Sequence, residues 1–331
     1  MTLILTLLGD TLPATLLAEL DALVDRYGLV VERREWLSNA TAAEQTAEEG
    51  ENSGACVACW LTGKALEEGS VDARALREQA LALGNAHGVD AAIQPSGEWQ
   101  GHRRLVCFDM DSTLIKTEVI DELARRHGVG DEVAVVTERA MRGELDFKQS
   151  FRQRMAKLEG LDEAVLADIA ANLPLMDGVE TLMANLKQQG YRTAIISGGF
   201  TYFARHLQQQ LGFDEIHANE LVIENGKVTG EVREPIVDAK RKAELLSQMA
   251  ERQGLSLSQV VAVGDGANDL EMLAQAGLGI AFRAKPLVRK QARQAISTLG
   301  LDAVLYLLGH ARKDWPAGSS SIGSAIHQLA E

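Results

Sequence analysis

The feature that most constrains the fold is a series of short apolar runs in the C-terminal part of the chain, separated by helical stretches. The runs are Leu105–Phe108, Thr193–Ile196, Glu215–His217, Val260–Val263 and Leu278–Ala281. Buried strands that alternate with helices are typical of a parallel, doubly wound sheet with helices on both faces. The sequence therefore predicts a Rossmann-like α/β domain over residues 104–310.

A long stretch between the first two runs carries no strand signal. Its helical periods cover Glu118–His127, Glu132–Met141, Phe147–Leu158 and Glu163–Ala171. They predict a helical cap inserted into the sheet domain at about residues 117–180. Further along, Leu221–Glu224 and Lys227–Glu231 are joined by Asn225-Gly226, which predicts a β-hairpin with a type I′ turn.

Residues 1–95 show a different order, β-α-β-β-α-β, which predicts a ferredoxin-like domain. The strand-like runs are Thr2–Leu8, Leu29–Trp36, Ala55–Thr62 and Val89–Gln94, and the helical runs are Ala14–Tyr27 and Asp72–His87. The acidic segment Ser38–Gly54 is expected to be a mobile loop, residues 96–103 a linker and residues 311–331 a loose tail.

Composition argues against several function classes. The chain has 33 Lys+Arg against 47 Asp+Glu, a net charge of −14, so phosphate backbones and anionic membranes repel it. No apolar run approaches the roughly 18 residues that a membrane helix needs, and the start lacks a basic leader. Three cysteines are too few for a disulfide framework. We therefore expect a cytoplasmic protein that binds neither nucleic acid nor a membrane.

Two carboxylates follow the first strand of the predicted sheet. Asp109 and Asp111 stand directly after Leu105–Phe108, and ligands bind at the carboxyl ends of strands in open α/β sheets. Acids this close repel each other unless a cation lies between them, which favours a hard divalent metal such as Mg²⁺. A solvated turn after a strand would give the same pattern, and the motif alone does not distinguish the two.

Three later segments strengthen the metal and phosphate interpretation. The strand Val260–Val263 opens onto Asp265, a further candidate metal ligand, and the flanking glycines permit close backbone approach. Ser197 and Gly198 follow another strand and offer a hydroxyl and backbone N–H groups to phosphate oxygens. Lys242 stands near a predicted helix start; taken alone, a lysine there is ordinarily a solvent-facing residue.

Together these segments resemble the haloacid dehalogenase (HAD) superfamily, whose four motifs occur here in the expected order. The motifs are Asp109–Thr113, Ser197, Lys242 and Gly264–Asp269, within a region from about Leu105 to Leu308. The dehalogenases of that superfamily lack the acid at Asp111, and its P-type ATPases carry threonine there. The resemblance therefore implies a phosphatase or a phosphomutase.

A narrower resemblance is to the phosphoserine phosphatase family. It rests on Asp109–Thr113, Glu118, Met141–Phe147, Ser150–Arg154, Ser197–Phe200 and Val263–Asp269. In that family the cap supplies a Glu and an Arg for the amino-acid end of the substrate. Glu118 and Arg154 hold the matching positions, with Met141 and Phe147 as apolar walls. A zwitterion needs an anion for its ammonium group and a guanidinium for its carboxylate, which agrees with this assignment.

Without the resemblance, simpler interpretations of the two cap residues would be preferred. Arg154 would lie on a solvated helix face, and Glu118 would be an acid at a helix N-terminus, where the dipole favours it.

The resemblance implies an Mg²⁺-dependent hydrolysis of O-phospho-L-serine, the last step of serine biosynthesis. Asp109 is the implied nucleophile, which forms an aspartyl-phosphate, and Asp111 the implied general acid and base. The implied metal ligands are Asp109, Asp265 and the backbone carbonyl of Asp111. The implied phosphate contacts are Ser197, Gly198, Lys242 and Asn268, with Asp269 in support.

Two alternatives stay open for the function. One is a phosphatase for another small phosphorylated metabolite, and the other is a non-enzymatic amino-acid sensor on a degenerate scaffold. The sensor is disfavoured because Asp109, Asp111, Ser197, Lys242 and Asp265 are all present.

The N-terminal domain leaves its role open. Its order of elements resembles an ACT-like module, of the kind that often binds amino acids across a dimer interface, which implies a homodimer and a regulatory ligand. A dimerisation or packing domain without a ligand is the alternative. Cys56 and Cys59 match a CxxC pattern, but residues three apart in a strand point to opposite faces, which favours two ordinary core residues.

Overall fold

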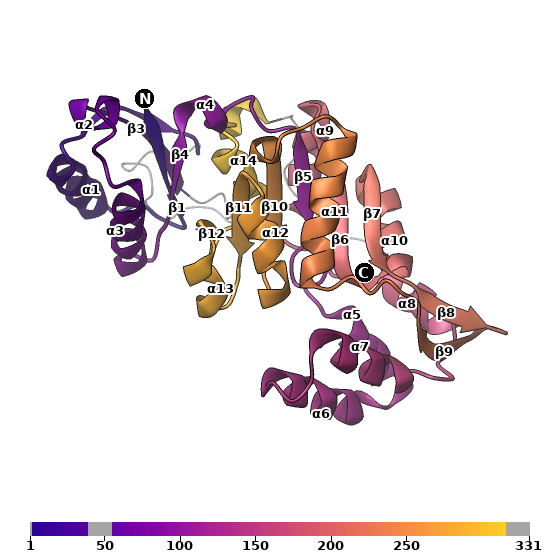
Figure 1. Cartoon of the computed structure of the whole chain (residues 1–331). Coiled ribbons are helices and arrows are strands. Elements are labelled where there is room, and N and C mark those ends of the chain that lie inside the picture. Colours follow the sequence, from indigo (N-terminus) through magenta and orange to yellow (C-terminus); the bar gives the residue numbers. More distant parts are fainter. Residues whose placement is uncertain (1, 39–54, 316–331) are drawn as a thin grey trace, which may run out of the picture.

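The computed structural model describes residues 2–38 and 55–315. A small N-terminal domain lies beside a larger α/β domain, and a group of helices projects from the larger domain (Figure 1). The segment 39–54, predicted to be a mobile loop, and residues 316–331 of the predicted tail lie outside the described residues. In the described ranges, no helix is both long and apolar enough to cross a membrane.

The N-terminal domain has the predicted β-α-β-β-α-β order. Its strands are β1 (Leu3–Gly9), β2 (Val30–Trp36), β3 (Ala55–Thr62) and β4 (Asp90–Pro95). Its helices are α1 (Ala14–Arg26), α2 (Lys64–Glu67) and α3 (Ala73–Ala86). The strands pair antiparallel in the order β2-β3-β1-β4, which is a ferredoxin-like arrangement. Leu5 of β1 packs with Leu16 of α1 and Leu76 of α3, so these helices cover one face of the sheet.

The other face of this sheet packs against the larger domain. Cys56 lies in the apolar core that the sheet shares with that domain, whereas Cys59 lies in the core beneath α1 and α3. The two side chains point to opposite faces because strand residues alternate. All three cysteines are buried and free. The interpretation of Cys56 and Cys59 as two separate core residues is confirmed.

The larger domain contains a parallel sheet of six strands in the order β12-β11-β10-β5-β6-β7. The strands are β5 (Leu105–Phe108), β6 (Arg192–Phe200), β7 (Glu215–Asn219), β10 (Val260–Gly264), β11 (Leu278–Phe282) and β12 (Gln294–Ile296). One face is covered by α11 (Ala239–Arg252) and α12 (Leu270–Gln275), and the other by α9 (Val179–Gln188), α10 (Thr201–Leu211) and α14 (Val304–Leu307). The predicted doubly wound α/β fold is confirmed. Only β12 was missed, because its three residues are too few for an apolar run to be recognised.

The predicted cap follows β5 and is confirmed. Its helices are α5 (Val119–His127), α6 (Gly130–Met141), α7 (Phe147–Ala156) and α8 (Ala164–Ala171). The hairpin of β8 (Leu221–Glu224) and β9 (Lys227–Val232) turns at Asn225 and Gly226, which both have positive φ, as a type I′ turn requires. The hairpin is attached to the cap, because Gly160 N donates to Val228 O and Val228 N donates to Leu161 O.

Two segments expected to be irregular pack against the domains. The predicted linker begins with α4 (Ser96–Trp99), where Trp99 is 5% exposed and its ring meets that of Trp60 edge-on at 5.2 Å. In the predicted loose tail, Trp315 is buried against Tyr306, and Arg312 N donates to Leu37 O. The expectation of a loose tail is therefore wrong for residues 311–315. Large aromatic side chains bury enough apolar area to order a short segment.

The remaining elements are short. They are α13 (Pro286–Gln291) and the 3₁₀ helices η1 (Leu257–Gln259), η2 (Ala267–Asp269), η3 (Leu301–Ala303) and η4 (Arg312–Asp314).

Candidate active site

A cavity of 410 Å³ lies at the carboxyl end of the parallel sheet, between the larger domain and the cap. Its lining comes from the segments after β5 and β10, from the carboxyl-terminal residues of β6, from α5 and α7 of the cap, and from the start of α13. The predicted site residues in the lining are Asp109, Asp111, Glu118, Phe147, Arg154, Ser197, Gly198, Asp265 and Asn268. The structure thus brings together residues from four separate regions of the sequence.

The turn after β5 places the two predicted carboxylates. Ser112 has a positive φ of 57°, and the backbone N–H groups of Leu114 and Ile115 both donate hydrogen bonds to Met110 O. This tight turn leaves Asp109 4% exposed and Asp111 half-buried in the wall of the cavity. The arrangement differs from a solvated turn, since both acids lie inside the protein.

Lys242 lies beneath the cavity and is completely buried. Its Nζ is 2.8 Å from Asp109 Oδ1 and donates to Asp269 Oδ1 at 2.7 Å. Burial acts to lower the pKa of Lys242, but the two carboxylates outweigh burial and raise that pKa above its ordinary value. Lys242 is therefore a fixed cation beside Asp109 and not the solvent-facing residue of the simpler interpretation.

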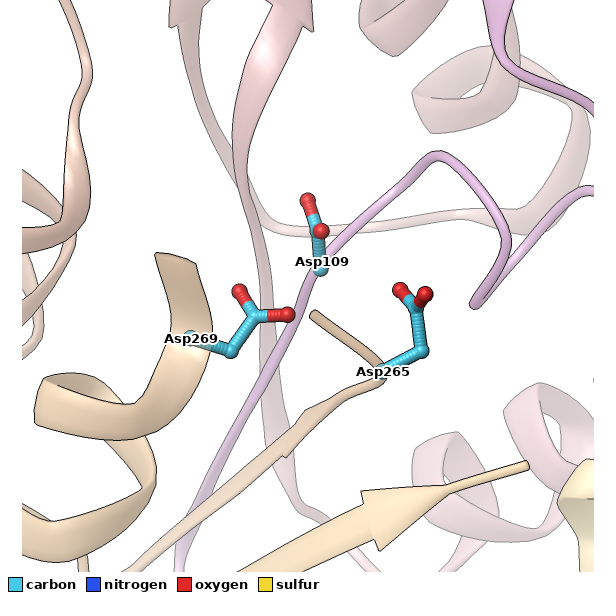
Figure 2. Close-up of side chains that lie close together, drawn as sticks. All are labelled: Asp109, Asp265 and Asp269. Atoms are coloured by element: carbon cyan, nitrogen blue, oxygen red, sulfur yellow. The ribbon is translucent and has the colours of Figure 1, made fainter. Parts of the chain in front are cut away.

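Three carboxylates form an acidic cluster at the floor of the cavity. One oxygen of each of Asp109, Asp265 and Asp269 lies within 4.8 Å of the others, and Figure 2 shows the three side chains close together. In the described ranges this is the only group of three or more His, Cys, Asp or Glu side chains with metal-binding geometry. Asp269, predicted as a supporting residue, is the third member. Its other oxygen accepts from Gly266 N at 3.0 Å.

Burial and mutual repulsion raise the pKa values of the acids in this cluster. Burial and then Asp269 raise the pKa of Asp109 to about 7, although Lys242 acts in the opposite direction. Burial and Asp269 also raise the pKa of Asp265 to about 6, against a hydrogen bond of 3.2 Å that Thr113 Oγ1 donates to it. Buried carboxylates that crowd together without enough positive charge fit a hard divalent cation, which prefers oxygen ligands.

Asp111 faces the cavity beside this cluster. Burial, followed by Glu118 and Asp109, raises the pKa of Asp111 well above its usual range. Its Oδ1 is buried and has no hydrogen-bond partner among the described residues. A carboxyl group with a raised pKa and an unused oxygen that faces a cavity is suited to proton transfer.

Glycines bring the backbone close to the acids. Ser197 is 1% exposed, and its Oγ accepts from Gly199 N at 2.9 Å. A Cβ added at Gly199 would lie 2.8 Å from Asp111 Oδ2, and one added at Gly264 would lie 2.4 Å from Asp269 Cγ. Side chains at these two positions would displace the carboxylates, so the close approach requires glycine.

The cap contributes one cation to the cavity. Helix α7 begins at Phe147, after a capping box formed by Asp146 and Gln149. Arg154, two turns further on, lines the cavity, and its Nε is buried without a hydrogen-bond partner in the described part of the chain. Burial lowers the pKa of Arg154, while the acids Asp121, Glu118 and Asp111 act to raise it. By contrast, Arg152 is exposed and pairs with Glu234 on the surface.

Met141 is the one predicted wall residue that the structure does not bring to the cavity. It lies at the end of α6, is 75% exposed and is not part of the lining. Apolar wall is supplied instead by Ile120, Phe151, Leu287 and Val288, which sequence reasoning missed. The last two follow β11, and their place after the carboxyl end of a parallel strand was a usable signal.

Comparison with known proteins agrees with the fold and the site. The profile of the haloacid dehalogenase-like hydrolase family matches residues 103–277. A solved HAD family hydrolase from Salmonella enterica serovar Typhi aligns with 93% of this chain and 99% of its own, at a TM-score of 0.78 and 29% identity. The chain therefore belongs to the haloacid dehalogenase-like hydrolase family.

Curated relatives narrow the family further. The phosphoserine phosphatase of Archaeoglobus fulgidus is 45% identical over 248 residues, which cover 74% of this chain and 72% of the relative. That of Streptomyces coelicolor is 49% identical over 246 residues, which cover 74% of this chain and 59% of the relative. Within the family, the chain thus groups with the phosphoserine phosphatases. It spans between 59% and 72% of the length of these two relatives.

Proposed function

We propose that this chain is an Mg²⁺-dependent phosphoserine phosphatase that hydrolyses O-phospho-L-serine to L-serine and phosphate, the last step of serine biosynthesis. One observation carries the proposal: a single cavity combines an acidic cluster with a buried lysine at its floor and an arginine and a glutamate from the cap. The first set suits a phosphoryl group with a divalent cation, and the second suits the carboxylate and ammonium of an amino acid. The names of the relatives support the same substrate.

The first half-reaction transfers the phosphoryl group to the protein. An oxygen of Asp109 attacks phosphorus in line with the seryl oxygen; the new P–O bond forms as the bond to serine breaks. Lys242, at 2.8 Å, favours the ionised form of Asp109 that this attack needs. Asp111 donates its proton to the departing seryl oxygen, which its raised pKa makes available.

The second half-reaction regenerates the protein. Asp111, now ionised, takes a proton from a water molecule, and the resulting hydroxide attacks phosphorus. The P–O bond to Asp109 breaks, and inorganic phosphate is released. One carboxyl group therefore serves as acid and then as base, which is consistent with its position beside the nucleophile and not in contact with Lys242.

The phosphoryl oxygens are held by polar groups around the cluster. Lys242, Ser197 Oγ, the Gly198 N–H and Asn268 bind them, and Asp269 orients Lys242 through the bond of 2.7 Å. Asp109, Asp265 and the backbone carbonyl of Asp111 would hold Mg²⁺. When bound, the ion offsets the repulsion between the carboxylates and the phosphate dianion.

The cap selects the amino-acid end. Arg154 binds the substrate carboxylate, and Glu118 binds the ammonium group. The Nε of Arg154 is buried and has no hydrogen-bond partner among the described residues, so it is free to donate to that carboxylate. Phe147 supplies an apolar wall from the cap. Closure of the cap would add Met141 to this wall and exclude water until the ester is bound.

The test is phosphate release from a panel of phosphomonoesters, with Mg²⁺ and with EDTA. The panel contains O-phospho-L-serine, O-phospho-L-threonine, O-phosphoethanolamine and glucose 6-phosphate. We expect kcat/KM for O-phospho-L-serine to exceed that of O-phosphoethanolamine and of glucose 6-phosphate by about two orders of magnitude, because each of these esters lacks at least one of the two charged groups of the amino-acid end. O-phospho-L-threonine keeps both charged groups and differs by one methyl group, so its kcat/KM should be lower by about one order of magnitude. Equal rates across the panel, or full activity in EDTA, would contradict the proposal. Binding of serine without turnover of any ester would instead indicate a sensor.

The proposal extends to the domain organisation. Residues 1–95 are an ACT-like regulatory or dimerisation domain, residues 96–103 the connection, and residues 104–310 the catalytic unit. Strand β2 ends the four-stranded sheet without a neighbour among the described strands, which supports a homodimer through this domain. Three free thiols suit a reducing, cytoplasmic environment. Light scattering after size-exclusion chromatography, with and without L-serine, tests the dimer and its ligand.

A further inference from the structure

Helix α13 stands between the cavity and the N-terminal domain. Leu287 and Val288 of this helix, together with Lys285 just before it, line the cavity. The next residue, Arg289, contacts the N-terminal domain instead. Its Nη2 donates a hydrogen bond to Asn85 Oδ1 at 3.0 Å and lies 3.8 Å from Asp90 Oδ1. Asn85 belongs to α3 and Asp90 begins β4, so one short helix touches both the substrate cavity and the N-terminal domain.

Asp90 is a buried anchor for the same segment. It is 5% exposed and accepts hydrogen bonds of 2.6 Å from both Ser297 N and Ser297 Oγ. Ser297 directly follows β12, and within that strand Gln294 Nε2 donates to Ile93 O at 3.5 Å. The chain from Lys285 to Ser297 is therefore held by the N-terminal domain near both of its ends. In Figure 1 this part of the larger domain, with α13 and β12, lies on the side that faces α3 and β4.

Apolar packing alone holds α13 weakly. Its one buried side chain, Val288, belongs to a small cluster with Ala281, Ala284 and Ala295, against which the partly buried Leu270 and Ala292 also pack. Leu287 is 62% exposed at the cavity and adds little. A helix of six residues is not stable by itself, because it forms too few backbone hydrogen bonds to offset the ordering of its residues. Contacts outside the helix must therefore fix its position. The hydrogen bond from Arg289 to Asn85 is directional and charge-assisted, and Asp90 adds an opposite charge at 3.8 Å.

We propose that Arg289 and Asp90 are positioning residues through which the N-terminal domain holds α13 and so sets one wall of the substrate cavity. The inference rests on the proposed function. Helix α13 contributes no group to the cluster of Asp109, Lys242 and Asp269. Loss of the Arg289 contact therefore weakens substrate binding and leaves the chemical steps almost unchanged.

The test uses the full chain with Arg289→Gln, and with Lys290→Gln as the matched control. Lys290 is the adjacent residue of α13, is exposed and forms no ion pair in the described part of the chain. Three quantities are measured: the amide hydrogen exchange of residues 285–292, and kcat and KM for O-phospho-L-serine. For Arg289→Gln we expect exchange to be about tenfold faster, and KM to be about five- to tenfold higher with kcat changed less than about twofold. Lys290→Gln leaves all three unchanged, and Arg289→Lys, which keeps a cation near Asp90, recovers most of the change in KM.

A second pair of variants separates positioning from general stability. Asp90→Asn should raise KM in the same way. The double variant Asp90→Asn/Arg289→Gln should raise KM by less than the product of the two single effects, because the two residues hold the same segment and lie 3.8 Å apart. A lower melting temperature with unchanged KM and unchanged exchange in α13 would show that the contact only joins the domains, and would overturn the inference. If the wild-type chain does not hydrolyse O-phospho-L-serine, the proposed function fails; the exchange rates still decide whether Arg289 holds α13.

Discussion

Replacement of Arg154 by methionine separates recognition of the substrate's carboxylate from the chemistry at Asp109. Methionine keeps the apolar stem and removes the guanidinium. Because the Nε of Arg154 has no partner among the described residues, the substitution breaks no hydrogen bond at that atom. Burial disfavours the charged form of Arg154, as its lowered pKa shows. We therefore expect the free energy of unfolding to change by less than about 1 kcal/mol, with stabilisation the favoured direction.

The effect on activity is large by comparison. A guanidinium that grips a carboxylate through two charge-assisted hydrogen bonds contributes about 1.5–3 kcal/mol per bond, part of which water returns when the bond is absent. A net loss of about 3 kcal/mol corresponds to a decrease of about two orders of magnitude in kcat/KM for O-phospho-L-serine. The loss should fall mainly on KM, because Arg154 lies in the cap and makes no contact with Asp109 or Lys242.

The assay measures three proteins, the wild-type chain, Arg154→Met and Arg152→Met, with two substrates, O-phospho-L-serine and O-phosphoethanolamine. O-phosphoethanolamine lacks the carboxylate, so Arg154→Met should hydrolyse it as fast as the wild-type chain does. Arg152→Met is the matched control: Arg152 lies on the same helix, is exposed and pairs with Glu234, and its removal should leave both substrates unaffected. An equal loss on both substrates for Arg154→Met would refute the assignment, since the guanidinium would then act on the phosphate or on the fold.

Four further predictions concern the floor of the cavity. Asp109→Asn should abolish turnover, because an amide cannot act as the nucleophile. The melting temperature should stay the same or rise, because the amide is neutral and replaces a buried acid whose ionised form is disfavoured. Phosphate release measures the turnover, and circular dichroism on heating measures the melting temperature. Lys242→Met should lower the free energy of unfolding, measured by urea titration, by about 3–5 kcal/mol, because it leaves Asp109 and Asp269 buried without their cation. A second change in the same chain, Asp269→Asn, should recover part of that loss of stability. In metal-free protein the pKa values of Asp109 and Asp265, about 7 and about 6, lie above the ordinary 3.8. The folded chain thus binds these protons more tightly than the unfolded chain, and the free energy of unfolding should fall as pH rises from about 4 to about 7. Over the same window the affinity for Mg²⁺ should rise, because the ligands must lose their protons, and calorimetric titration should show proton release; an affinity independent of pH would contradict these assignments.

Local sequence patterns predicted the parts of the site that lie within one short segment. The apolar run before Asp109 and the one before Asp265 predicted two buried strands of one parallel sheet, and the carboxyl ends of such strands lie at one edge of a sheet. The structure shows that the two strands are neighbours. The turn at Asn225 and Gly226 was predicted equally well, because a type I′ turn depends on only two residues. The opposite faces of Cys56 and Cys59 follow from the alternation of side chains along a strand.

Contacts between distant segments were decided by the tertiary structure. A helical period does not predict that Lys242 is buried between two carboxylates, or that the Nε of Arg154 is buried without a hydrogen-bond partner among the described residues. Each observation depends on which face of a helix packs against another element. The exposure of Met141 depends on where the cap stands relative to the sheet.

The sequence by itself therefore determined the order of the elements, the sheet class and the acids at the strand ends, because these follow from backbone geometry over a few residues. Only the tertiary structure decided that the N-terminal sheet covers the larger domain and that Arg289 reaches Asn85, about 200 residues earlier in the chain. Such pairings arise when whole elements bury their remaining apolar faces against each other, and no local pattern records which faces will meet.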